Sequence, residues 1–224
     1  MRPSGAASGP VGAILAGGRS LRMGTDKALV AVGGVPMIEW VAGALQVVVD
    51  EVVIVGRNGP LAGIPAIPDL RPGPRGPLPG LVAALRHAAG RPVLLVAVDH
   101  PLVRPATLQG LVGLLDQDAV VPVDGGVRQI TCAAYPAAWA EAADLEDRAG
   151  GSIQSLLDRL PHREVRREEW AIWGEDGRSW HSVDTPGAAA AVLDRYGAAR
   201  GRGGPPAPRR GLPSGFDTQE GSSP

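Results

Sequence analysis

Residues 14–29, Ile-Leu-Ala-Gly-Gly-Arg-Ser-Leu-Arg-Met-Gly-Thr-Asp-Lys-Ala-Leu, join the end of an apolar segment to a loop that is rich in glycine and in cationic side chains. The preceding residues 11–16 have the near-continuous apolar character of a strand buried on both faces of a parallel sheet. Gly17 and Gly18 allow positive φ and close approach, so their amides can point at an anion. Three cationic side chains follow in the loop: Arg19, Arg22 and Lys27. Guanidinium and ammonium groups suit phosphate oxygens, so the segment predicts a triphosphate-binding loop.

The glycine spacing distinguishes this loop from two common nucleotide-binding motifs. A Walker loop has four residues between its first glycine and Gly-Lys-Ser/Thr, whereas five residues separate Gly18 from Gly24. Lys27 follows three positions later, and Ala28 after it has no hydroxyl for magnesium. The Gly-x-Gly-x-x-Gly spacing of dinucleotide-binding proteins is also missing. The sequence therefore disfavours a P-loop kinase, a GTPase and an NAD-binding protein.

The segment 15–29 resembles a known motif, Leu-Ala-Gly-Gly-x-Ser-x-Arg-Met-Gly-x-Asp-Lys-Ala-Leu, at every specified position. This is the motif of the MobA-like NTP transferase family, and within it of the molybdenum cofactor guanylyltransferases. Shorter segments resemble later motifs of that family in the same order: 33–38, 69 with 76–80, 98–101, 128–135 and 183–186. The resemblance covers residues 10–197 and implies a Rossmann-like nucleotidyltransferase fold.

Composition and charge are those of an enzyme with one catalytic domain. The chain has 224 residues, is 44% hydrophobic and carries a net charge of −1, which gives no electrostatic case for nucleic acid or an anionic membrane. No apolar run approaches a membrane span, and residues 1–9 lack the apolar run of a signal peptide, so we expect a cytoplasmic protein. The single cysteine, Cys132, is interpreted as a small buried hydrophobe rather than a nucleophile.

Composition also divides the chain. Residues 1–9 and 198–224 are rich in small residues, Gly, Pro, Arg and Ser, and are predicted to be disordered. Between them, residues 10–197 are predicted to form the nucleotidyltransferase domain.

Strand-like and helix-like segments alternate within this domain. We predict strands at 11–16, 51–55, 92–98, 119–123 and 129–135, and helices at 37–47, 78–89, 105–115, 136–143, 152–160 and 186–196. This alternation predicts an α/β fold with three layers and a doubly wound, mostly parallel sheet. Ligands of such sheets bind beyond the carboxyl ends of the strands. Gly17, Asn58 and Asp99 all follow strand ends, so one crevice can hold them together.

Asp99 and Asp184 are candidate magnesium ligands. The apolar strand that ends at Val98 delivers the Asp99 carboxylate to its carboxyl end, where sheet stability requires none. Mg²⁺ prefers one or two carboxylates with phosphates and water. Alternatively, Asp99 caps a helix entering at Pro101, and Asp184 caps one that begins at Pro186. The neighbouring phosphate loop favours the metal for Asp99. Asp184 remains open, because guanylyltransferases of the family usually carry Asn there and the related cytidylyltransferases often carry Asp.

The resemblance implies the other site residues. Catalytic roles fall on Arg22, Lys27 and Asp99. Nucleotide contacts fall on Leu15, Ala16, Gly17, Gly18, Arg19, Ser20, Lys27, Asn58, Asp69 and Asp99. From the residues alone, a plain turn explains Asn58 better than a nucleotide contact does. Asp69 could hydrogen-bond a ribose or base or order the Pro-rich loop 65–79, and only the resemblance favours the first.

The chemistry these residues suggest is attack of a phosphate monoester on the α-phosphorus of a nucleoside triphosphate, with pyrophosphate leaving. The resemblance implies GTP as donor, molybdenum-carrying molybdopterin phosphate as acceptor and Mg²⁺ as cofactor, with molybdoenzymes or cofactor-biosynthesis proteins as further partners. A cytidylyltransferase, or a nucleotidyltransferase with another phosphorylated small molecule as acceptor, is the close alternative. A catalytically inert nucleotide-binding or cofactor-delivery protein would have lost Arg22, Lys27 or Asp99, and all three are present.

Overall fold

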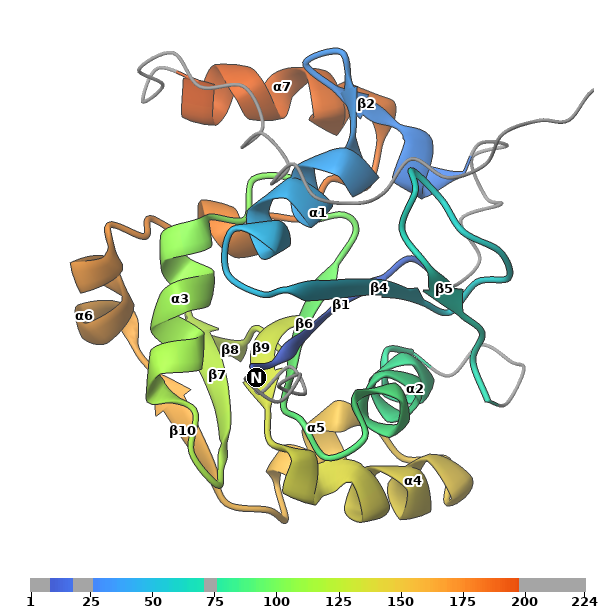
Figure 1. Cartoon of the computed structure of the whole chain (residues 1–224). Coiled ribbons are helices and arrows are strands. Elements are labelled where there is room, and N and C mark those ends of the chain that lie inside the picture. Colours follow the sequence, from blue (N-terminus) through green and yellow to red (C-terminus); the bar gives the residue numbers. More distant parts are fainter. Residues whose placement is uncertain (1–8, 18–25, 71–75, 198–224) are drawn as a thin grey trace, which may run out of the picture.

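A computed structural model of the chain describes residues 9–17, 26–70 and 76–197, in which helices cover both faces of one central sheet (Figure 1). The predicted disorder at both ends of the chain therefore concerns residues that lie, apart from Gly9, outside the described part. The three-layer, doubly wound α/β fold predicted from the sequence is confirmed. No helix in the described ranges combines the length and hydropathy needed to cross a membrane.

The central sheet has the strand order β10-β7-β9-β6-β1-β4-β5, with β8 paired to β7. The strands are β1 (Val11–Leu15), β4 (Glu51–Val55), β5 (Ala66–Ile67), β6 (Val93–Ala97), β7 (Ala119–Asp124), β8 (Val127–Arg128), β9 (Cys132–Tyr135) and β10 (His162–Val165). All pairings along this path are parallel except those of β9, which runs antiparallel to β6 and β7. The observed sheet is therefore mostly parallel, as the sequence predicts.

The helices divide between the two faces of the sheet, because successive strand residues point to opposite sides. In β6, Val93 and Leu95 pack with the helices α2 (Leu78–Ala88), α4 (Ala140–Arg148) and α5 (Ile153–Leu157). Leu94 and Val96 pack on the other side with α1 (Met37–Gln46), α3 (Pro105–Leu114) and α6 (Arg167–Trp170). Burial on both faces explains why the strands are apolar at nearly every position.

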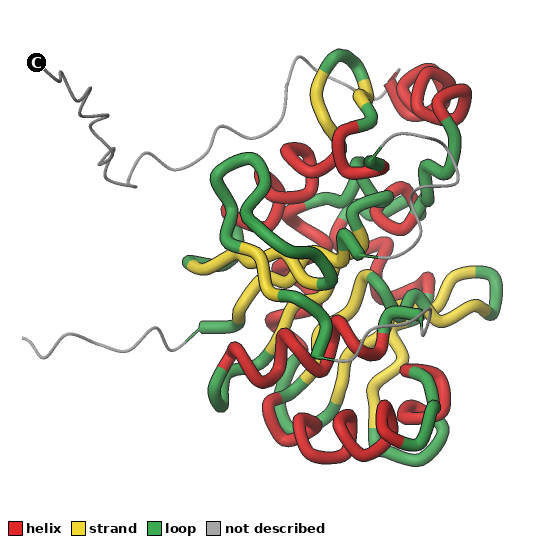
Figure 2. The backbone as a smooth tube through the Cα atoms, turned by 90° about the vertical axis from the view of Figure 1, so that its right-hand side faces the viewer, coloured by secondary structure: helices red, strands yellow, loops and turns green. Residues whose placement is uncertain are grey.

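A third, smaller cluster lies outside these layers. The two-stranded hairpin β2 (Ala31–Val32) and β3 (Val35–Pro36) packs with α7 (Pro186–Gly197). Figure 2 shows the hairpin and α7 together at one end of the molecule. Met37 and Trp40 of α1, with Leu102 and Val183, complete the cluster. The C-terminal helix is thereby tied to the segment that follows the phosphate loop.

The register of the central strands aligns their carboxyl ends. Leu15 pairs with Val55 of β4 on one side and with Ala97 of β6 on the other. The loops that follow β1, β4 and β6 therefore leave the same edge of the sheet. This is the edge at which ligands of doubly wound sheets bind.

The predicted elements differ from the observed ones mainly where segments are short or polar. The strand at 51–55 was placed correctly, but the helix predicted at 136–143 is a 3₁₀ turn (Ala137–Trp139) followed by α4, which continues to Arg148. An Asp144–Arg148 ion pair one turn apart supports this extension. The strands β2, β3, β5, β8 and β10 and the helix α6 were not predicted, because two to four residues show no clear periodicity. The other 3₁₀ turns within the described residues are η2 (Lys27–Leu29), η4 (Ala171–Trp173) and η5 (Arg178–Trp180).

Candidate active site

The Lys27 ammonium lies between two carboxylates at the edge where β1 and β6 end. Its Nζ donates to Asp99 Oδ2 at 2.7 Å and to Asp184 Oδ1 at 2.6 Å. The Lys27 and Asp99 side chains are mostly enclosed, whereas 71% of the Asp184 side chain is exposed. The structure therefore brings together three of the predicted site residues from distant parts of the chain.

Asp99 follows β6 in a turn rather than at the start of a helix. The turn is closed by the His100 amide, which donates to the Ala97 carbonyl at 3.1 Å. The next helix, α3, begins only at Pro105, with Arg104 at its N-cap. The alternative in which Asp99 caps a helix at Pro101 is therefore wrong, and its carboxylate faces Lys27 instead.

Asp184 caps no helix either. The hydroxyl of Thr185 accepts a hydrogen bond from the Ala188 amide at 3.0 Å and so caps α7. The preceding residues fasten this segment to Asp99, because the Val183 amide donates to the Asp99 carbonyl at 2.8 Å. The Ser182 hydroxyl also donates to Asp99 Oδ2 at 3.0 Å. Ser182 was missed from the sequence, although it stands directly before the segment 183–186 that resembles the family motif.

Lys27 is held in place by residues that sequence reasoning also missed. Asp26 caps the 3₁₀ turn η2 by accepting from the Ala28 amide at 3.1 Å. Its other carboxylate oxygen accepts from Arg57 Nη1 at 2.8 Å. Because Arg57 follows directly on β4 and Gly56, the end of the phosphate loop is tied to the neighbouring strand.

Electrostatics favour a charged lysine between charged carboxylates. Burial alone would lower the pKa of Lys27, but the hydrogen bonds and charges of Asp184 and Asp99 raise this pKa above its usual value. The Lys27 ammonium in turn holds the pKa of the Asp184 carboxyl below its usual range. Burial lowers the pKa of His100, so this imidazole next to Asp99 is neutral at pH 7.

Asp99 has an oxygen available for a cation. Its Oδ1 is enclosed, and no residue in the described ranges donates a hydrogen bond to it. A buried carboxylate oxygen without a donor is costly, and a cation would satisfy it. Among the described residues no group of three or more His, Cys, Asp or Glu side chains could hold a metal. A pair of carboxylates suits Mg²⁺, which completes its coordination with phosphates and water, better than it suits Zn²⁺.

The first glycine of the loop packs against the end of β4. A Cβ atom on Gly17 would lie 2.5 Å from the Gly56 carbonyl oxygen, a distance that no side chain tolerates. The side chain of Asp69 reaches the same place, since its Oδ1 would lie 3.5 Å from a Cβ on Gly56. Burial and the nearby Asp147 raise the pKa of Asp69, and no described residue donates to its buried Oδ1. Asn58, two positions beyond Gly56, is exposed.

The remaining predicted residues fall into two groups. Leu15 and Ala16 are half-buried at the end of β1, where the Ala16 amide donates to the Val55 carbonyl at 3.1 Å. Four predicted residues lie outside the described part of the chain: Gly18, Arg19, Ser20 and Arg22. The structure thus groups Lys27, Asp99 and Asp184 on one side of Gly17, and places Asn58 and Asp69 by the β4 and β5 strands on the other.

Comparison with known proteins agrees with this geometry. Residues 12–202 match the MobA-like NTP transferase domain. The chain is 44% identical over 128 residues to a probable molybdenum cofactor guanylyltransferase of Pelotomaculum thermopropionicum, a match that covers 55% of this chain and 62% of that relative. It is 34% identical over 192 residues to a probable molybdenum cofactor guanylyltransferase of Natronomonas pharaonis, covering 78% of this chain and 92% of the relative. The crystal structure of molybdopterin-guanine dinucleotide biosynthesis protein A from Archaeoglobus fulgidus superposes with a TM-score of 0.70 at 26% identity, over 83% of this chain and 99% of that one.

Proposed function

The chain belongs to the MobA-like NTP transferase family, and from this membership we propose that it is a nucleotidyltransferase that transfers GMP from GTP to a molybdenum-carrying molybdopterin phosphate and releases pyrophosphate. The main support for the proposal is that Lys27, which follows the loop after β1, contacts both Asp99 and Asp184. That loop bears the motif of the family, and the similar proteins named molybdenum cofactor guanylyltransferase supply the identity of both substrates.

The reaction requires alignment and charge neutralisation rather than proton abstraction. A phosphate monoester has a second pKa of about 6 and is already ionised near neutral pH. Its attack on the α-phosphorus of GTP forms one P–O bond and breaks the bond to pyrophosphate. The site accordingly contains cations and hydrogen-bond donors, and the neutral His100 has no substrate proton to remove. Holding the two anions in line is the main contribution of the protein.

Each side chain has a distinct task in this scheme. Lys27 and Arg22 bind phosphate oxygens and stabilise the charge that develops on the leaving pyrophosphate. Amides of the glycine-rich loop after Ala16 donate hydrogen bonds to the triphosphate. Asp69 accepts hydrogen bonds from ribose hydroxyls, which would satisfy its buried oxygen. Asn58, exposed after β4, contacts the nucleotide.

Asp99 and Asp184 are the residues that would hold Mg²⁺. The fit rests on the enclosed Asp99 Oδ1 that lacks a donor and on a second carboxylate close enough to share the same ammonium. When bound, the ion would neutralise triphosphate charge and assist departure of pyrophosphate. Because Lys27 donates to the same two carboxylates, its ammonium would compete with a cation for them, and Lys27 would be free to bind phosphate when the cation is present.

A nucleotide panel tests the proposal. Melting temperature is measured with GTP, CTP, ATP and UTP in the presence of Mg²⁺, because a preferred nucleotide stabilises the folded state by mass action. Pyrophosphate release is then measured with molybdopterin phosphate as acceptor. We expect a preference for GTP and release that depends on the acceptor. Preference for CTP, which Asp184 in place of the usual Asn would favour, would support the cytidylyltransferase instead. Nucleotide binding without release would identify an inert binding protein.

A further inference from the structure

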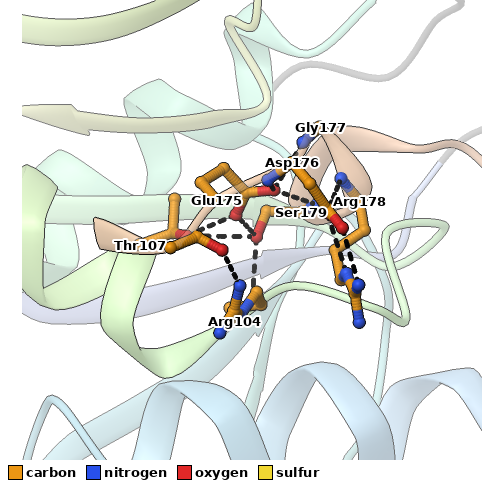
Figure 3. A network of polar contacts seen from close by, with 8 residues as sticks. Arg104, Thr107, Glu175, Asp176, Gly177, Arg178 and Ser179 are labelled. Atoms are coloured by element: carbon orange, nitrogen blue, oxygen red, sulfur yellow. Dashed lines mark hydrogen bonds and ion pairs between the residues drawn. The ribbon is translucent and has the colours of Figure 1, made fainter. Parts of the chain in front are cut away.

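The two chain segments that carry Asp99 and Asp184 are joined a second time around the buried Glu175 (Figure 3). Glu175 is only 4% exposed. Its carboxylate accepts hydrogen bonds from the hydroxyls of Thr107 and Ser179. Figure 3 shows Glu175 between Thr107, which belongs to α3, and Ser179, which belongs to the turn η5. The contact therefore links the helix after Asp99 to the loop before Asp184.

The loop also wraps its own backbone around this carboxylate. Glu175 Oε1 accepts from the amides of Asp176 at 2.9 Å, Gly177 at 2.8 Å and Ser179 at 3.3 Å. Gly177 adopts a φ of +94°, in the region that favours glycine, and so allows the chain to turn there. A buried carboxylate with five donors is well satisfied, and removing its charge would leave several of them without an acceptor.

Arg104 completes the link from the other segment. Its amide donates to the Ser179 hydroxyl at 3.0 Å, and its guanidinium donates to the Gly174 carbonyl. Arg104 stands five positions after Asp99, and Ser179 stands five positions before Asp184. Arg104 and Ser179 thus fix the two segments to each other, and each lies five residues along the chain from one of the two carboxylates.

The same two segments also contact each other directly at Asp99. Val183 and Ser182 donate to the carbonyl and to the carboxylate of Asp99, as described above. A shift of the 174–180 loop would therefore move Ser182 and Asp184 relative to Asp99. Sheet pairing does not hold this loop, because no strand lies between β10 and α7 in the described chain.

From this arrangement we infer that Glu175 is a positioning residue of the transfer site, which sets the separation of the Asp99 and Asp184 carboxylates at the value that binds a divalent cation. The inference rests on the proposed function, since it assumes that these carboxylates hold the metal. Glu175 itself accepts hydrogen bonds from Thr107, Ser179 and the backbone of its own loop, and the two proposed metal ligands are other residues. Its effect passes through Ser179 and Arg104 to the two segments.

Binding of Mn²⁺ to the full chain, followed by the electron paramagnetic resonance signal of the free ion, tests this role. Glu175→Gln keeps the size of the side chain but replaces one acceptor oxygen with an NH₂ group. This NH₂ group would then face some of the five groups that donate hydrogen bonds to the Glu175 carboxylate. We expect about tenfold weaker Mn²⁺ binding, which is the effect of losing one to two of these hydrogen bonds. The metal concentration for half-maximal transfer should rise by a similar factor, while kcat at saturating metal stays within about threefold of the unaltered protein.

Glu146→Gln is the matched control. Glu146 of α4 is also buried, accepts from the hydroxyl of Ser155 on α5 at 2.6 Å and pairs with Arg159, which follows α5. This variant should melt at a lower temperature, yet bind Mn²⁺ as the unaltered protein does. Should Glu175→Gln fail to fold, Ser179→Ala removes only the hydroxyl that joins Arg104 to Glu175, and we expect it to weaken Mn²⁺ binding in the same direction.

The outcomes separate this inference from the proposed function. If Asp99→Asn binds Mn²⁺ as tightly as the unaltered protein, Asp99 is not a metal ligand, and the positioning role of Glu175 is then wrong as well. If Asp99→Asn loses Mn²⁺ binding while Glu175→Gln and Ser179→Ala lower only the melting temperature, the metal site stands and Glu175 is merely structural. Loss of Mn²⁺ affinity in Glu175→Gln and in Ser179→Ala, but not in Glu146→Gln, supports the positioning role.

Discussion

The amide of Val183 donates a hydrogen bond of 2.8 Å to the carbonyl of Asp99, which joins the end of a central strand to the segment leading into the last helix. This backbone contact does not depend on the identity of either side chain. It brings the next residue, Asp184, to the side of Lys27 that Asp99 does not occupy. The two-carboxylate site is therefore a product of backbone topology as well as of side-chain chemistry.

Lys27→Met should lower nucleotidyl transfer by about 10²–10³-fold, because it removes a charge that stabilises the transition state. The same substitution should tighten Mn²⁺ binding in the absence of nucleotide, since the ammonium no longer competes for Asp99 and Asp184. Turnover and Mn²⁺ titration measure the two effects. Unchanged turnover would remove Lys27 from the mechanism, and unchanged Mn²⁺ affinity would show that the ammonium does not compete.

Asp99 and Asp184 should differ in importance. Asp99→Asn is expected to lower transfer by at least about 100-fold, because an amide is a poor magnesium ligand and Asp99 is the more enclosed of the pair. Asp184→Asn should lower transfer by about tenfold or less, since 71% of the Asp184 side chain is exposed to water that can take its place. Pyrophosphate release over a magnesium titration distinguishes them. A larger loss for Asp184→Asn would reverse this assignment.

Asp69→Asn should raise the melting temperature at pH 7–8 while weakening GTP binding. Burial and the nearby Asp147 raise the pKa of Asp69 above its value of 3.8 in the unfolded chain. The folded state therefore binds this proton more tightly, so the carboxyl destabilises the fold increasingly as pH rises above the unfolded pKa, and the full penalty is reached above the folded pKa. Asparagine removes this penalty, and the difference between the variants should vanish below about pH 4. Thermal melts across pH and GTP titrations provide the test, and a lower melting temperature at pH 8 would contradict it.

Gly17→Ala should lower both stability and GTP affinity. The new methyl group would lie 2.5 Å from the Gly56 carbonyl oxygen, so the ends of β1 and β4 must separate. Overpacking of this kind costs about 1–3 kcal/mol. Gly113→Ala, within α3 and with no atom near its Cβ, is the control and should leave the melting temperature unchanged or raise it. Equal behaviour of the two variants would show that the contact with Gly56 is unimportant.

A chain that ends at Gly197 should keep both the melting temperature and the turnover of the full chain. Residues 198–224 contain few large apolar residues and cannot offset an ordering cost of about 1–2 kcal/mol per residue. This tests residues 10–197 as the catalytic domain. A substantial loss of either property would mean that the C-terminal segment packs on the domain or on the acceptor.

The sequence predicts the central strands and most helices because burial on both faces leaves an unmistakable apolar pattern in β1, β4 and β6. It does not reveal two-residue strands such as β2 or β5, whose pairing depends on tertiary contacts. Within the site, Asp99 could be predicted because it follows the apolar strand β6, and Lys27 because it belongs to the glycine-rich cationic loop after β1. Ser182, Arg57 and Glu175 could not, since their partners come from remote segments. The capping alternatives for Asp99 and Asp184 fail because no helix begins at Pro101 and because Thr185, not Asp184, caps α7.

Lys27 is the single lysine among the 22 lysine and arginine residues of the chain. Its compact ammonium donates to the Asp99 and Asp184 carboxylates at the same time. One practical consequence is that an amine-selective acylating reagent has only Lys27 and the N-terminal amine to modify. Its reaction at Lys27, read by peptide mass, should be slow while the raised pKa and the two aspartates protect the nitrogen. The labelling rate would thus report how often Lys27 separates from Asp99 and Asp184, without any substrate, spectroscopic probe or engineered tag.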